Sequence, residues 1–266
     1  MLVLIRGAGD LASGIALRLH HCRMDVVMTD LPQPTAIRRA VCFSQALLCG
    51  HWQVEDVTAC ACTRDAEVRS ALEAGQIPVL ADPAADCRVW LQPDALVDAI
   101  LAKRNLGTRL TDAPIVVGVG PGFTAGTDCH AVVETMRGHT LGRTLYEGSA
   151  LPNTAVPGLI GGYAGERVLR APANGVFHPV LEIGDTVSAG DTAGTVEGVP
   201  MRCTVSGVLR GILADGTAVQ TGMKAGDVDP RGQREACFTV SDKALAVAGG
   251  VLEAILNLSG GENHGK

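Results

Sequence analysis

The chain has 266 residues, 47% of them hydrophobic, and a formal net charge of −6. This is enough apolar material for one large or two small domains, whereas the acidic balance and an aromatic content of 3% exclude a nucleic-acid binder that relies on basic patches and stacked rings. The opening apolar run is too short for a signal-peptide core, and Ala244–Leu256 is too short to cross a bilayer, so we expect a cytoplasmic protein with no membrane partner.

The first strand, turn and helix indicate a nucleotide-type fold. Leu2–Arg6 has the pattern of a buried strand, and it runs into a G-x-G-x-x-A turn followed by a helix to about Cys22. In Rossmann-like folds such glycines let a pyrophosphate approach the helix N-terminus, and an acidic residue about 20 positions on binds a ribose hydroxyl. The negative charge of Asp10 would repel a pyrophosphate bound at this helix. Alternatively, Asp10 is the N-cap and its side chain binds the N–H groups of the helix. The cofactor-binding residues predicted here are Gly7, Gly9, Gly14 and Asp30.

Alternating strands and helices continue to about residue 119. We predict a helix over 64–75 and strands over 25–29, 77–80, 95–101 and 115–119. This order favours a parallel, doubly wound sheet, in which ligands bind beyond the carboxyl ends of the strands. Because they follow one such end, Gly120 and Gly122 are predicted to face the same crevice as the first turn.

The segment 118–143, GVGPGFTAGTDCHAVVETMRGHTLGR, concentrates glycine with acid/base and basic residues. His130 and Glu134 fall on one side whether the segment is a strand or a helix. The catalytic candidates are His130, Glu134, Asp128 and His139. A metal site lacks the H-E-x-x-H or C-x-x-C spacing, so we predict none. We favour a phosphate or oxyanion site that uses the loop backbone with Arg137 or Arg143; the alternative is a salt-bridged polar face.

The C-terminal part contains an internal repeat at an offset of 32 residues, in which Gly175 aligns with Gly207 and Gly190 with Gly222. The stretch IGDTVSAGD at 183–191 resembles a biotinyl/lipoyl-type barrel-sandwich domain. Where a carrier of that kind places its lysine, this chain has Pro200. The resemblance therefore implies a docking or structural role for this part of the chain.

Taken in order, GAGDLASG, the 118–143 segment, GMKAGDVDPR and SDKALAVAGGVLEAIL resemble the accessory proteins of the selenium-dependent molybdenum hydroxylase system. The N-terminal part is similar to xanthine dehydrogenase accessory proteins. The resemblance implies a bacterial cytoplasmic protein that acts with a molybdenum hydroxylase client. At 266 residues the chain lacks the iron–sulfur cysteine spacings of the hydroxylase itself.

Together these features predict an α/β fold: a Rossmann-like parallel sheet domain (1–110), a glycine-rich segment that completes the site (111–165), a small all-β pseudo-symmetric barrel-sandwich (166–235), and a C-terminal helix and tail (236–266). The predicted function is a maturation factor for the hydroxylase. It would bind NAD(P), a molybdopterin-type nucleotide or another phosphate-bearing ligand between 7–14 and 118–143. The alternatives are an NAD(P)-dependent oxidoreductase acting on a small substrate and a non-catalytic scaffold. The residues leave open whether the protein is an enzyme and whether it forms a homo-oligomer.

Overall fold

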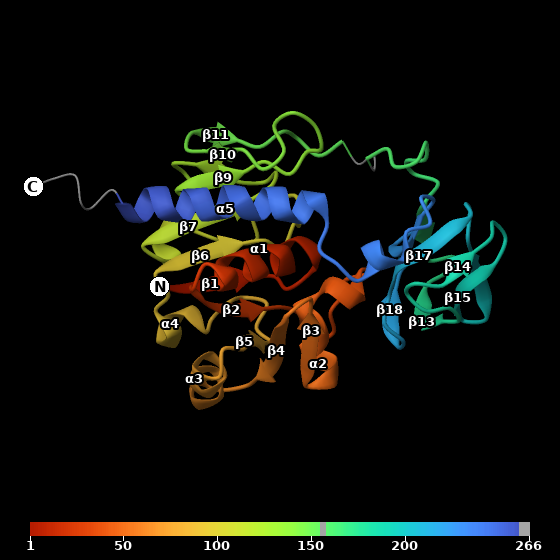
Figure 1. Cartoon of the computed structure of the whole chain (residues 1–266), viewed down its shortest axis with the longest axis horizontal. Helices are drawn as coiled ribbons and strands as arrows, with labels where there is room; N and C mark the ends of the chain where they lie inside the picture. Colours follow the sequence, from red (N-terminus) through yellow and green to blue (C-terminus); the bar gives the residue numbers. More distant parts are fainter. Residues whose placement is uncertain (155–157, 261–266) are drawn as a thin grey trace, which may run out of the picture. The chain divides into compact units, whose positions relative to one another are not determined.

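The computed structural model describes residues 1–154 and 158–260, which form two compact units (Figure 1). Unit 1 holds Met1–Pro32, Phe43–Thr154 and Val240–Lys266, and unit 2 holds Gln33–Cys42 and Ala155–Thr239. The units do not follow chain order, because a short early segment belongs to unit 2 and the C-terminal helix belongs to unit 1. The division into four segments that we expected from the sequence stays a prediction.

Unit 1 is built on a nine-stranded sheet with the order β10-β9-β7-β6-β1-β2-β5-β4-β3. Its strands are β1 (Leu2–Arg6), β2 (Asp25–Thr29), β3 (His51–Val54), β4 (Val57–Cys62), β5 (Ile77–Leu80), β6 (Ala95–Asp98), β7 (Ile115–Val119), β9 (Ala131–Val133) and β10 (Thr144–Leu145). The central strands are parallel, but β3 and β10 run antiparallel to their neighbours at the two edges. Two short strands outside this sheet, β8 (Thr124–Ala125) and β11 (Gly148–Ser149), pair with each other.

Two long helices of unit 1, α1 (Asp10–His21) and α5 (Asp242–Gly260), pack side by side (Figure 1). The approach is close: a Cβ on Gly14 would lie 2.7 Å from the Cβ of Ala244. By length and composition α5 could cross a bilayer. However, one row of its apolar side chains is buried in unit 1: Ala244, Val247, Ala248, Val251, Ala254 and Ile255.

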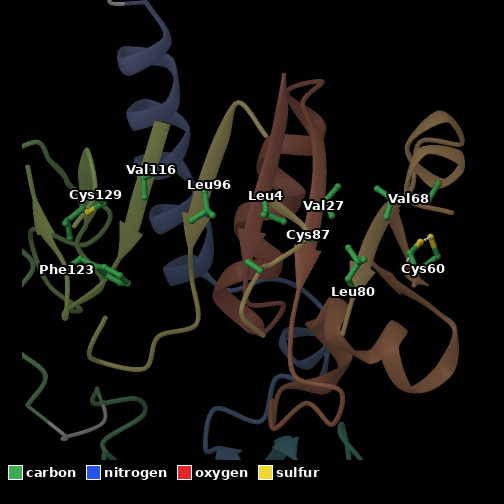
Figure 2. Packing of buried hydrophobic residues seen from close by; sticks show 14 of the residues in the cluster. Leu4, Val27, Cys60, Val68, Leu80, Cys87, Leu96, Val116, Phe123 and Cys129 are labelled. Atoms are coloured by element: carbon green, nitrogen blue, oxygen red, sulfur yellow. Dashed lines mark hydrogen bonds between the residues drawn. The ribbon is translucent and has the colours of Figure 1, made fainter. Parts of the chain in front are cut away.

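The remaining helices of unit 1 are short, and one of them covers the buried face drawn in Figure 2. They are α2 (Ala46–Cys49), α3 (Asp65–Glu73), α4 (Arg88–Leu91) and the 3₁₀ turns η2 (Phe43–Gln45) and η3 (Leu110–Asp112). On that face Leu4, Val27, Leu96 and Val116 line up across neighbouring strands and form one apolar cluster with Val68 of α3. Aliphatic side chains therefore build this core, as the low aromatic content predicts.

Unit 2 consists of two four-stranded antiparallel sheets, β12-β19-β17-β14 and β16-β15-β13-β18. The strands are β12 (Val168–Arg170), β13 (Gly175–Pro179), β14 (Thr186–Val187), β15 (Thr192–Val196), β16 (Val199–Arg202), β17 (Gly207–Ile212), β18 (Thr217–Val219) and β19 (Lys224–Asp229), with 3₁₀ turns η1 (Arg39–Val41) and η4 (Arg234–Cys237). The repeat is visible in the pairing: β18 from the second half joins β13 and β15 from the first, and β14 joins β17 and β19. Phe177, Leu209 and Ile212 lie fully buried within it.

The predicted fold class is wrong. We expected a parallel Rossmann-like sheet followed by a small barrel-sandwich and a helix, whereas the large sheet is mixed and three further antiparallel sheets accompany it. The edge strands are short and lack the long apolar run of a central parallel strand, so their antiparallel pairing left little trace in the sequence. The expected strand over 95–101 also ends early, at Asp98.

Candidate functional site

Asp30 and Gly7 hold the first turn of unit 1 together. The Asp30 carboxylate accepts hydrogen bonds from the backbone N–H groups of Ala8 at 2.9 Å and Leu31 at 2.7 Å, and burial raises its pKa. Gly7 has a φ of +105°, and a Cβ there would lie 2.9 Å from the backbone oxygen of Ala99. One oxygen of Asp30 therefore binds the glycine turn and the other binds the backbone that follows Asp30, where the sequence predicts a ribose contact.

Gly9 and Gly14 differ in what surrounds them. Gly14 packs against Ala244 of α5, so its role is helix packing. Gly9 is the N-cap of α1 and has no side-chain capping bond; a Cβ placed on it would meet nothing within 4 Å. Asp10 lies in the first helical turn and is not the cap. Of the three predicted glycines, Gly9 is the one that faces open space at the helix N-terminus.

The crevice predicted between 7–14 and 118–143 is filled by other parts of the chain. Strand β6 separates β1 from β7, and the loop that follows it packs against both glycine turns. A Cβ on Gly120, whose φ is +81°, would lie 2.8 Å from Thr135 Oγ1 and 3.6 Å from Leu101; one on Gly122 would lie 2.6 Å from the backbone of Arg104. Both glycines are needed for close backbone packing.

The four catalytic candidates hold separate stretches of backbone. The ring Nδ1 of His130 accepts a hydrogen bond from the Val116 N–H at 2.9 Å, and Asp128 accepts one from Thr124 N–H at 2.8 Å. Glu134 is buried and accepts bonds from the N–H groups of Met136 and Leu151, while His139 is exposed. Within the described residues, no hydrogen bond or ion pair joins two of these four side chains.

The two arginines of the segment also differ. Arg137 forms a two-pronged ion pair with Asp242 at the start of α5, with Nη–Oδ distances of 2.9 and 3.1 Å. Arg143 is exposed. Arg137 therefore fixes the loop after β9 to α5. The roles predicted for the glycines, the arginines and the catalytic candidates stay predictions.

Two lysines that are not among the predicted site residues influence each other electrostatically: the exposed Lys103, in the loop after β6, and Lys243, at the start of α5. Lys243 is the second residue of α5 and is partly buried. Burial lowers its pKa, and the charges of Lys103 and Arg137 lower it further, while Asp10 and Glu134 raise it. Burial also lowers the pKa of Lys103. Neither lysine makes a hydrogen bond or ion pair within the described part of the chain.

The loop that carries Lys103 is fixed by a buried arginine. Arg6, the last residue of β1, donates to Asp98 at 3.3 Å, to Thr108 Oγ1 at 3.0 Å and to the Leu106 carbonyl at 3.1 Å. Thr108 in turn donates to Asp98 at 2.6 Å. These bonds tie the beginning and the end of the loop to the sheet, so Lys103 stands on a held segment. The sequence contained one signal that could have pointed to these residues. Lysine is rare in this chain, with four in all, and two of the four belong to this region.

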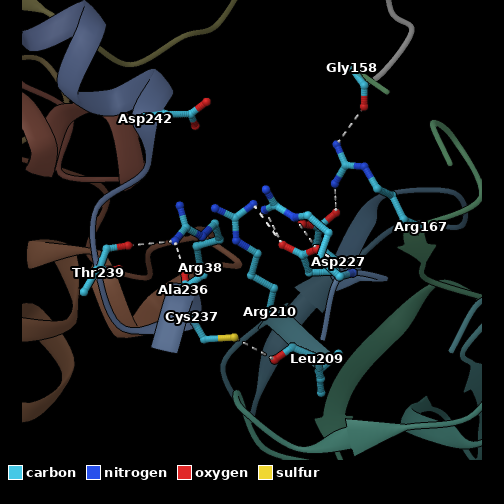
Figure 3. Close-up of polar contacts among 12 residues, drawn as sticks. Arg38, Gly158, Arg167, Leu209, Arg210, Asp227, Ala236, Cys237, Thr239 and Asp242 are labelled. Atoms are coloured by element: carbon cyan, nitrogen blue, oxygen red, sulfur yellow. Dashed lines mark hydrogen bonds and ion pairs between the residues drawn. The ribbon is translucent and has the colours of Figure 1, made fainter. Parts of the chain in front are cut away.

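Unit 2 contains a cluster of buried charged side chains, shown in Figure 3. Arg167 donates to Asp227 and to the Gly158 carbonyl, and burial raises the pKa of Asp227. Arg38 donates to the carbonyls of Ala236 and Thr239, both at 3.2 Å. The Arg38 bonds attach the early segment 33–42 to the rest of unit 2, so we read this cluster as structural.

No metal centre emerges from the parts of the chain that the structure describes: no three His, Cys, Asp or Glu side chains gather there. Cys60 and Cys62 share a face of β4 with their sulfurs 3.9 Å apart. Burial raises the pKa of both thiols, that of Cys62 to about 12. Two buried thiols of this kind belong to the apolar core shown in Figure 2.

No family model matches the chain. It is 50% identical over 257 residues to the uncharacterized protein YqeB of Escherichia coli K12; the match covers 97% of this chain and 48% of that protein. The chain therefore spans about half the length of the curated relative it matches.

Solved structures give weak likenesses. A succinylglutamate desuccinylase/aspartoacylase from Rhodobacter sphaeroides is 25% identical, with a TM-score of 0.21, over 24% of this chain and 22% of that one. An aspartoacylase family protein from Mesorhizobium loti is 13% identical, with a TM-score of 0.23, over 56% and 60%. At these scores neither likeness defines the fold or the function.

These comparisons correct the predicted family and function. The relative named above is uncharacterized, and the structures are named for desuccinylase and aspartoacylase; none of them is named as an accessory protein of a selenium-dependent molybdenum hydroxylase or as an NAD(P)-dependent oxidoreductase. The predictions of a maturation factor, of a nicotinamide-dependent enzyme, and of molybdenum, selenium and a Rossmann domain are therefore wrong, whereas the non-catalytic scaffold stays a prediction. The expected partners were not tested and stay predictions.

Proposed function

We propose that unit 1 binds a small organic anion at the carboxyl edge of its large sheet, beside the N-terminus of α1. The observation that carries this proposal is Lys243, a half-buried cation at the start of α5, where Ala244 packs against Gly14 of α1. It makes no hydrogen bond or ion pair among the described residues, and the charge of the exposed Lys103 is near enough to lower its pKa. A desolvated charge is costly unless an opposite charge compensates it. A carboxylate or phosphate group supplies that charge.

The N-terminus of α1 supports the same ligand class. The first N–H groups of a helix have no intrahelical acceptor and carry a partial positive charge. Gly9 provides no side-chain cap and leaves open space at this point. The ligand is small because the loop after β6 fills the rest of the edge, with Ala99 against Gly7 and Leu101 against Gly120.

The proposed ligand class includes the phosphate-bearing partner predicted from the sequence, and it equally includes carboxylates. Asp10, in the first turn of α1, is close enough to Lys243 for its charge to raise the pKa of that lysine, so the ligand competes with Asp10 for Lys243. We also propose a cytoplasmic location, supported by nine cysteines that are all free, as is usual for proteins in a reducing compartment.

Titration calorimetry with phosphate, citrate and pyruvate tests this function. We expect binding of at least one of these anions and a loss of about tenfold or more in affinity for Lys243→Met, because a hydrogen bond to a charged group contributes about 1.5–3 kcal/mol. Lys103→Met should weaken binding as well. Lys224→Met, which removes a lysine from unit 2, is the matched control and should bind like the wild type. Equal binding by all three variants would exclude this site.

A further inference from the structure

We propose that a second cavity of unit 1, at the amino edge of its large sheet, binds a small zwitterionic amino acid with an apolar side chain. The cavity has a volume of about 240 Å³ and is bordered by the C-terminal ends of α1 and α3 and by the start of β2, which are labelled in Figure 1. Ligand pockets usually measure about 300–1,000 Å³, so a metabolite of few atoms suits this one. It lies at the opposite end of α1 from Gly9, and the inference goes beyond the proposed anion site.

The apolar part of the lining comes from two elements. Met24 and Val26 are buried at the start of β2, and Leu72 of α3 is partly buried and packs against the apolar core of unit 1. Small-molecule sites typically combine such an apolar surface with a few polar groups that fix the orientation of the ligand. An aliphatic or thioether side chain therefore has a surface to contact here.

Two opposite charges line the same cavity. Arg23 and Asp25 are exposed and stand on either side of Met24 in the chain. Both lie close enough to His20 to influence its pKa, which Arg23 lowers and Asp25 raises. Nevertheless, no ion pair joins Arg23 to Asp25 within the described parts of the chain. A cation and an anion that do not neutralise each other match the α-carboxylate and the α-ammonium group of an amino acid.

The other polar groups of the lining fit the same two ends of the ligand. Helices α1 and α3 both end at the cavity, and the partial negative charge of a helix C-terminus favours a cation, in support of Asp25. Burial lowers the pKa of His20, and His21 lowers it further, so the ring is neutral at pH 7 and one of its nitrogens accepts a hydrogen bond. Gln76 lines the cavity as well, and its amide can donate to a carboxylate beside Arg23.

Methyl NMR of the full-length protein tests the proposal at the site itself. The chain has six methionines, so ¹³C-methyl-methionine labelling gives few signals, and Met24→Leu identifies that of Met24. We expect L-leucine to shift the Met24 signal in a saturable manner, while Met201 in the core of unit 2 keeps its position. Leucinamide lacks the carboxylate, 4-methylpentanoate lacks the ammonium group and glycine lacks the side chain. Each should bind at least about fivefold more weakly than leucine.

Two variants match these ligands to the two charges. Arg23→Gln and Asp25→Asn should each weaken leucine binding by about three- to fivefold, the range for exposed ion pairs. Arg23→Gln should leave the affinity for leucinamide unchanged, and Asp25→Asn that for 4-methylpentanoate, because the interaction each variant removes is already missing. Glu73→Gln, which removes an exposed charge at the end of α3 outside the lining, is the matched control and should bind leucine like the wild type.

Three results would overturn the inference. A Met24 signal that stays in place at tens of millimolar leucine, methionine or phenylalanine in folded protein excludes the cavity as an amino-acid site. Leucinamide or 4-methylpentanoate binding as tightly as leucine excludes the zwitterion. Loss of leucine binding in Lys243→Met would place the amino acid at the carboxyl edge of the sheet, at the other end of α1.

Discussion

Asp30 accepts a hydrogen bond from the backbone N–H of Ala8 at 2.9 Å. The acidic residue that follows β2 therefore holds the glycine turn that follows the neighbouring strand, β1. The other oxygen of Asp30 accepts the Leu31 N–H. In a sequence, this aspartate is indistinguishable from one that binds a ribose, because both stand at the carboxyl end of the second strand. Its bonds give it a structural role that a stability measurement can test.

Asp30→Ala should lower the free energy of unfolding by about 2–3 kcal/mol, because it removes two hydrogen bonds and leaves a buried N–H unpaired. Asp30→Asn should cost about half as much, since its amide oxygen replaces one acceptor. Urea denaturation followed by circular dichroism measures both. Asp56→Ala, which removes an exposed partner of His21, is the control and should change stability little. An Asp30→Ala variant with the same free energy of unfolding as the wild type would contradict the structural role.

Gly249 and Gly250 form a matched pair within α5. A Cβ on Gly250 would lie 2.2 Å from the Gly142 carbonyl oxygen, whereas one on Gly249 meets nothing within 4 Å. Gly250→Ala should therefore destabilise the protein by about 1–3 kcal/mol or more. Gly249→Ala should stabilise it by up to about 1 kcal/mol through helix propensity. Thermal unfolding of the two variants side by side checks the prediction, and equal melting temperatures would refute it.

Substitutions at Gly7 and Gly9 should distinguish an effect on folding from an effect on binding. Gly7→Ala places a side chain at a φ of +105° and 2.9 Å from the Ala99 oxygen, so it should lower stability. Gly9→Ala meets open space and should cost at most about 1 kcal/mol as a poorer cap, while weakening the proposed binding of anions. Calorimetry and thermal unfolding on the same samples measure both properties. Unchanged anion affinity in folded Gly9→Ala would place the ligand elsewhere.

Because the pKa of Lys243 is lowered in the folded protein, the free energy of unfolding should change with pH in the alkaline range. Below its folded pKa the amine is charged in both states, and burial of that charge opposes folding. Between the folded pKa and the ordinary lysine value of about 10.4, the unfolded chain binds more protons, so stability rises with pH. Relative to Lys243→Met, which lacks the charge, the wild type should therefore gain stability from neutral pH towards pH 10. Urea titrations at several pH values measure the difference, with Lys224→Met as the control.

Thiol reactivity provides a further test of burial. Cys22 and Cys49 are exposed, whereas burial raises the pKa of Cys62 and Cys87 to about 12. Because the thiolate is the reactive form, iodoacetamide at pH 8.5 should modify the two exposed cysteines first and the two buried ones only in denaturant. Mass spectrometry of the alkylated peptides identifies the sites. Rapid modification of Cys62 in folded protein would contradict its position in the core.

Local elements were predictable where one physical signal dominates. The strands 2–6, 25–29, 77–80 and 115–119 are found at the predicted positions, because each is an apolar run that ends at glycine, aspartate or alanine. The strand expected over 95–101 stops at Asp98, whose carboxylate binds Arg6 and Thr108. That ending depends on a partner 92 residues away in the chain, which periodicity does not report.

The candidate site was less predictable for the same reason. In the sequence, Lys243 follows Ser241 and Asp242 at the start of a helix, and Lys103 follows a predicted strand, so each lysine has an ordinary local explanation. Their electrostatic interaction depends on α5 returning to the first unit and packing on α1 at Gly14 and Ala244. Gly7, Gly120 and Gly122, which we predicted to contact a ligand, have positive φ and lie close to neighbouring chain segments; such packing leaves the same sequence signature as a phosphate loop, and their role in binding stays a prediction.

The return of α5 to unit 1 also orders events during synthesis. The ribosome releases the sheet, α1 and the whole of unit 2 before residues 240–260 appear. Until then the surface of α1 that receives Ala244 stays uncovered, and exposed apolar surface of this kind makes nascent chains prone to aggregate and attractive to chaperones. Unit 2 can complete its core on the ribosome, whereas the unit that begins the chain is the last to close.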